Sequence, residues 1–101
     1  MFEFDEEKAF QAEMAVSHNE AFARRCVANY HKIKHKEMQE IFVAWINGKC
    51  IPFEYEGLTL EDICQKFKGA SYGQAISEMD IIIGHPLAAK MFKTGELFPM
   101  K

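Results

Sequence analysis

The sequence predicts an all-α fold, a small bundle of four or five helices around one long central helix. Apolar residues recur at steps of three, four or five from Asn19 to Asn47, and no proline interrupts this stretch. Such spacing places side chains on one side of an α-helix. Residues typical of helix starts and ends divide the rest of the chain into shorter helices. The length of 101 residues fits a single domain over residues 1–101.

The first helix is expected to begin after Asp5, which is a suitable N-cap. Glu6 and Glu7 then fall in the first turn, where the helix dipole favours negative charge. A break is expected near Ser17, because Ser17 and Glu20 have the spacing of a capping box that starts a new helix. The alternative is that the two segments run on as one helix.

The central helix is expected to span Asn19 to Asn47 and to end at Gly48, which accepts the left-handed conformation of a helix end. Its apolar side turns along its length. At 100° per residue, the apolar residues within 22–33 centre at roughly 35°, and those within 38–45 centre at roughly 150°. A straight helix would therefore face two different sets of neighbours, or the helix bends around residues 34–36.

The segment from Lys49 to Gly57 is too short for a helix and is interrupted by Pro52, so an extended conformation is expected. A rival interpretation makes residues 42–46 and 49–55 a hairpin across Asn47–Gly48, since an Asn-Gly pair is a strong hairpin signal. The helical pattern that continues through the preceding residues favours the helix over this hairpin.

Three further helices are expected in the last part of the chain. Each has a residue suited to its first turn and a glycine suited to its end. The limits of these helices are Thr59 and Gly69, Ser71 and Gly84, and Pro86 and Gly95.

Composition and charge exclude several classes of protein. With 49% hydrophobic and 27% charged residues, the chain is globular rather than disordered. The net charge of −3 argues against general nucleic-acid binding. No apolar run approaches the roughly 18 residues of a membrane span, and the acidic N-terminus is unlike a signal peptide. We therefore expect a cytoplasmic protein with no membrane contact, in which Cys26 and Cys64 are reduced thiols on apolar helix faces.

The nine Phe residues are more than so small a core readily hides, unless all of them are core. We expect some aromatic side chains to contact a partner protein or a second copy of the chain. The sequence therefore predicts a non-enzymatic protein-interaction module, such as a small regulator or inhibitor of a larger protein assembly. The expected partner-binding residues are aromatic side chains on helix faces: Tyr30, Phe42, Trp45 and Phe92. Trp45 is equally a candidate for the core.

Two other classes of function remain as alternatives. Arg25, Lys32 and Lys36 fall within roughly 40° on one face of the expected central helix, where they could bind nucleic acid or remain a solvated surface. His31 and His35 have the spacing of metal ligands on a helix, but no third ligand is evident. We therefore expect no metal and no cofactor. The sequence contains no phosphate-binding loop, paired-carboxylate signature or Ser-centred elbow, so no catalysis is expected.

Overall fold

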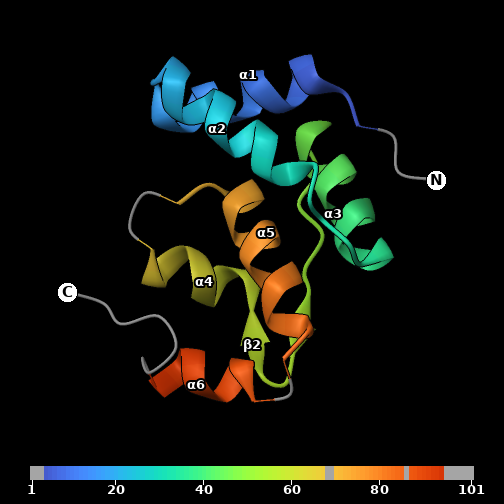
Figure 1. Ribbon diagram of the computed structural model, residues 1–101, viewed down its shortest axis with the longest axis vertical. Helices are drawn as coiled ribbons and strands as arrows, with labels where there is room; N and C mark the ends of the chain where they lie inside the picture. Colours follow the sequence, from blue (N-terminus) through green and yellow to red (C-terminus); the bar gives the residue numbers. More distant parts are fainter. Residues whose placement is uncertain (1–3, 68–69, 86, 95–101) are drawn as a thin grey trace.

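The computed structural model describes residues 4–67, 70–85 and 87–94, and this part of the chain forms six helices and one short β-hairpin (Figure 1). The all-α class is confirmed, with six helices in place of the expected four or five. The helices are α1 (Glu6–Ser17), α2 (Glu20–Tyr30), α3 (Lys36–Ile46), α4 (Leu60–Lys66), α5 (Tyr72–Ile83) and α6 (Ala88–Thr94), and the strands are β1 (Glu54–Tyr55) and β2 (Leu58–Thr59).

The expected break near Ser17 is confirmed, although a different residue caps the second helix. α1 ends at Ser17, and His18 takes the left-handed conformation with φ of 55°. The side chain of Asn19, not that of Ser17, accepts the backbone N–H of Phe22 at 2.9 Å. Asn19 is therefore the N-cap of α2.

The prediction of one long central helix is wrong, because residues 31–35 are not helical and separate α2 from α3. The carboxylate of Asp80 in α5 accepts the backbone N–H of Lys34 at 3.0 Å and that of His35 at 2.8 Å. The first N–H groups of a helix have no partner within it, and His35 makes no side-chain cap of its own. Asp80 therefore caps α3 from another helix. The apolar residues of 22–33 and of 38–45 point in different directions on a straight helix because most of them belong to two helices, α2 and α3, that are separated by this bend.

The helix at the centre of the fold is α5, which contacts α2, α3, α4 and α6 (Figure 1). Its N-cap Ser71 forms a capping box with Gln74. Its buried residues, from Gly73 near its start to Ile82 near its end, cover roughly half of its circumference at 100° per residue, and Ile81 on the other side is exposed. A buried face this wide has to be largely apolar. Apolar side chains of the neighbouring helices thus pack against α5 and form the core with it.

The alternative hairpin across Asn47–Gly48 is not formed, because α3 continues to Ile46. A short hairpin lies further on, where β1 pairs antiparallel with β2. It turns at Glu56–Gly57, whose φ angles are 52° and 81°. Two positive φ values are the pattern of a type I′ turn, which glycine adopts without steric cost.

Within the described residues, none of the helices combines the length and the apolar character that crossing a bilayer requires.

Candidate functional site

Three of the four expected partner-binding residues lie in the core. Tyr30 is 1% exposed, and Phe42 and Phe92 are each 0% exposed. The ring centroids of Tyr30 and Phe42 lie 4.5 Å apart between α2 and α3. Only Trp45 is partly exposed. In this conformation the three buried rings cannot reach a partner, and a binding site has to be sought elsewhere.

The expected basic face does not form a single surface of one helix. Arg25 lies on α2, Lys32 lies in the turn that follows, and Lys36 is the first residue of α3. All three side chains are exposed. Because the chain bends between them, the angular alignment calculated for a straight helix does not apply.

His31 and His35 each contact a carboxylate of a different helix. His31 Nε2 lies 2.9 Å from Glu6 Oε2, and His35 Nδ1 lies 2.8 Å from Asp80 Oδ1. The ring of Phe4 also stacks on His31, with 4.2 Å between the ring centroids. Among the described residues, no group of three or more His, Cys, Asp or Glu side chains is placed to hold a metal ion.

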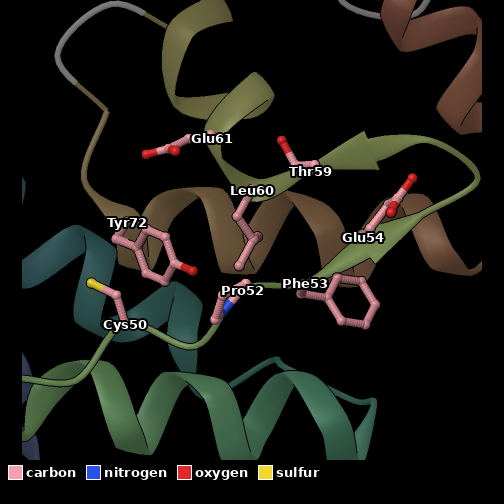
Figure 2. A pocket seen from close by; sticks show the side chains of 8 residues that line it. All are labelled: Cys50, Pro52, Phe53, Glu54, Thr59, Leu60, Glu61 and Tyr72. Carbon is pink, nitrogen blue, oxygen red and sulfur yellow. The ribbon is translucent and has the colours of Figure 1, made fainter.

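An open groove of about 520 Å³ lies between the segment at residues 50–54, the junction of β2 and α4, and the start of α5 (Figure 2). Leu60 and Pro52 lie in its middle, Tyr72 and Glu61 lie toward one end, and Glu54 lies toward the other (Figure 2). The residues that line this groove are Cys50, Pro52, Phe53, Glu54, Thr59, Leu60, Glu61 and Tyr72.

Two local features hold the walls of the groove in place. Thr59 and Asp62 form a capping box that starts α4, with bonds of 2.9 and 3.1 Å between side chains and backbone N–H groups. This box fixes Leu60 and Glu61 in the first turn. On the opposite wall, the Tyr72 hydroxyl donates a hydrogen bond of 2.8 Å to the carbonyl of Ile51. The extended segment is thereby tied to α5.

The extended segment presents free backbone groups beside the groove. Residues 50–52, which precede the hairpin, make no backbone–backbone hydrogen bond to any described part of the chain. The side chain of Ile51 is 43% exposed. Pro52 has no N–H, and the Ile51 carbonyl already accepts the Tyr72 hydroxyl. The available groups are therefore the N–H groups of Cys50 and Ile51 and the carbonyls of Cys50 and Pro52. Such groups pair with water or with an added strand.

The groove is electrostatically negative. Glu54 and Glu61 are exposed, and neither forms an ion pair within the described ranges. Burial raises the pKa of Tyr72, and negative charge on Cys50, Cys64 and Glu61 raises it further. Uncompensated carboxylates at the rim of an apolar groove favour a cationic group in a bound molecule.

The three cysteines differ in exposure, and all three are free thiols. Cys50 is exposed at the groove, whereas Cys26 is 4% exposed. Burial raises the pKa of Cys26 to about 11, with a further contribution from the charge of Glu13. Burial also raises the pKa of Cys64, as do the charges of Glu61 and Cys50. Of the two thiols expected on apolar helix faces, Cys26 is buried and Cys64 is only partly buried.

We predict that iodoacetamide at pH 8 alkylates Cys50 first and Cys26 last, because the thiolate is the reacting form and must be accessible. Peptide mass spectrometry over a time course measures the three rates. In guanidinium chloride the rates should converge, which provides the control. Equal rates in the native protein would contradict the burial of Cys26.

Sequence reasoning did not identify this groove. Two features of the groove are local in sequence, the Glu56–Gly57 turn and the Thr59–Asp62 capping box. Neither indicates which distant segment forms the opposite wall. The groove arises only because Tyr72 returns to the extended segment through the Ile51 carbonyl. No protein-family model, no curated protein and no solved structure matches this chain.

Proposed function

We propose that this chain is a protein-interaction module whose groove receives an extended segment of a partner protein. The partner segment would carry a Lys or Arg beside an aliphatic or aromatic residue. The observation that carries this proposal is the apolar groove with the Glu54 and Glu61 carboxylates at its ends.

The apolar floor supplies the affinity for a side chain. Pro52 is exposed and the rings of Phe53 and Tyr72 are partly exposed, so these three residues offer apolar surface that a bound aliphatic side chain would remove from water. The carboxylates at the two ends would form charge-assisted hydrogen bonds with an ammonium or guanidinium group. Both requirements are met by a short segment in which basic and apolar residues alternate.

The backbone beside the groove supports an extended rather than a helical ligand. Residues 50–52 make no backbone–backbone hydrogen bond in the described chain, and of their groups only the Ile51 carbonyl accepts a side chain, so an added strand could pair with the others. In such recognition, main-chain hydrogen bonds give affinity and side-chain pockets give specificity. A surface of this size suits reversible binding, as in a regulator or inhibitor of a larger assembly.

Amide NMR shifts during a peptide titration test the proposal. One hexapeptide alternates Leu and Lys, and the matched hexapeptide alternates Leu and Glu. We expect the Leu/Lys peptide to shift the amide signals of residues 50–54, 58–61 and Tyr72, and the Leu/Glu peptide to leave them unchanged. Equal shifts with both peptides, or shifts spread over α1 and α2, would count against the groove.

Charge reversal at the rim should weaken binding of the Leu/Lys peptide. We predict that Glu61→Lys raises the dissociation constant about tenfold, since like charges repel across the site. The matched control is Glu7→Lys, an exposed residue of α1 with the same change in charge. It should leave the dissociation constant within about twofold, because Glu7 does not line the groove and salt screens charges that are not in contact with the ligand. Equal weakening by both variants would indicate a non-specific effect of net charge.

A further inference from the structure

The helix α1 packs over an aromatic cluster formed by Tyr30, Phe42 and Trp45. The Phe42 centroid lies 4.5 Å from that of Tyr30 and 6.0 Å from that of Trp45. Phe4, in the segment leading into α1, stacks on Phe42 with 5.5 Å between centroids. α1 contacts both α2 and α3, which carry the cluster. Its position therefore decides whether this side of the cluster meets solvent.

Few apolar side chains hold α1 in place. Its buried residues are Ala9 and Glu13, both 0% exposed. Phe10 and Ala12 are only partly buried against the core. Burial of an alanine side chain removes little apolar surface from water. Exposed residues of α1 add two polar contacts, Glu6 with His31 and Lys8 with Asn47. The buried contact of α1 centres on the Glu13 carboxyl group, which makes docking sensitive to the ionisation of that group.

The Glu13 carboxyl is enclosed among uncharged groups. It faces Cys26 and Tyr30 of α2, Trp45 of α3 and Ser71 at the start of α5. These groups meet at Gly73, where an added Cβ would lie 2.6 Å from Trp45 Cζ3, 2.7 Å from the Tyr30 hydroxyl and 3.1 Å from Glu13 Oε2. The site therefore has no room for a larger residue at Gly73.

Only one oxygen of the Glu13 carboxyl has a hydrogen-bond donor. Oε2 accepts the Ser71 hydroxyl at 2.7 Å, whereas Oε1 has no partner among the described atoms. Within the same part of the chain, no Lys or Arg forms an ion pair with it. Arg25 is close enough to lower the pKa of Cys26 but does not pair with Glu13. Burial raises the pKa of Glu13, and the Ser71 hydrogen bond offsets part of this rise.

The Ser71 hydroxyl has only one hydrogen to donate in a hydrogen bond. Its hydroxyl oxygen accepts the Gln74 backbone N–H at 3.0 Å and lies 3.4 Å from the Tyr30 hydroxyl. Its single hydrogen is directed at Glu13. An ionised Glu13 would hold a full negative charge away from water with one hydrogen bond, which is strongly unfavourable. A protonated Glu13 carries no such charge.

We infer that α1 is a proton-controlled cover, which stays docked while Glu13 is a neutral carboxylic acid and is released from Tyr30, Phe42 and Trp45 when Glu13 ionises. In released α1, Glu13 has its ordinary pKa of 4.5. Docking is therefore strongest below that pH and weakens as the pH rises, and it becomes constant above the raised pKa of the docked state.

Hydrogen exchange of the full chain between pH 5 and pH 8, corrected for intrinsic exchange rates, tests this inference. In the wild type, the protection of α1 amides should fall by up to about tenfold per pH unit in the titrating range, because one proton is released. The protection of α5 should fall by less than that of α1. In Glu13→Gln, which is neutral at every pH, α1 protection should not change with pH. The matched control is Glu78→Gln, since burial also raises the pKa of Glu78 in α5, and it should keep the wild-type behaviour of α1.

Three results would overturn the inference. The first is a parallel loss of protection in α1 and α5, which would mean that the whole domain unfolds. The second is a wild-type pH dependence that persists in Glu13→Gln, and the third is α1 protection that does not vary with pH in the wild type.

A second measurement does not depend on whether Glu13→Gln folds. Trp45 is the single tryptophan, so acrylamide quenching of fluorescence reports the exposure of the aromatic cluster. Carbon NMR of the Glu13 carboxyl gives its titration midpoint in the wild type. Matching midpoints for quenching and for the Glu13 titration are expected, and different midpoints would refute the proton-controlled cover.

Discussion

Phe42→Ala is expected to lower the free energy of unfolding by about 3–5 kcal/mol, the usual range for a large ring removed from a core. Phe42 is 0% exposed and packs against Tyr30, Trp45 and Phe4. Alanine would leave a cavity between α2 and α3 that the short helices cannot close without losing other contacts. Urea denaturation followed by circular dichroism measures the change.

Val16→Ala provides the control for Phe42→Ala. Val16 is 45% exposed on α1, and its substitution should change the free energy of unfolding by less than about 0.5 kcal/mol, as is usual for surface positions. A loss below about 1 kcal/mol for Phe42→Ala would contradict its place in the core. Phe42 would then return as a candidate for partner binding.

Asp80→Ala is expected to lower the free energy of unfolding by about 3 kcal/mol, because hydrogen bonds to charged groups contribute about 1.5–3 kcal/mol each and are not additive. Asp80 is 6% exposed, and its carboxylate accepts the backbone N–H groups of Lys34 and His35 and contacts the His35 ring. Without the carboxylate, two donors at the start of α3 lose their acceptor. Chemical denaturation measures the loss.

Two further variants separate the bonds at Asp80. Asp80→Asn keeps one carbonyl acceptor and should lose less stability than Asp80→Ala. His35→Ala removes only the ring contact, which is partly exposed to solvent, and should have a smaller effect than either. If all three variants have the same stability, the ring contact rather than the backbone cap would be the important one.

The parts of the fold that depend on neighbouring residues were predictable. Asp5, Thr59 and Ser71 cap helices as expected, because a cap involves residues two or three positions apart. The turning of the apolar side led to a bend around residues 34–36 as one alternative, and the observed break at residues 31–35 overlaps it. A complete separation of α2 from α3 was not predicted, since the acceptor that stabilises it is Asp80, 45 residues from His35.

The site was predicted less well than the fold, for a related reason. Tyr30, Phe42 and Phe92 were assigned to a surface because the sequence indicated more aromatic residues than a bundle around one long helix could bury. The described part of the chain instead forms short helices, four of which contact α5, and these rings fill the interior between them. The groove depends on the approach of Tyr72 to Ile51, a contact that no spacing pattern encodes.

The position of α5 late in the chain has a consequence for biosynthesis. Ser71 and Asp80, which contact Glu13 and the start of α3, are translated after the whole of α1, α2 and α3. At about 5–20 residues per second, Tyr30 and Phe42 leave the ribosome seconds before the helix that encloses them. During that interval the nascent chain exposes aromatic side chains that chaperones recognise, and native packing of its first half must wait for the last third.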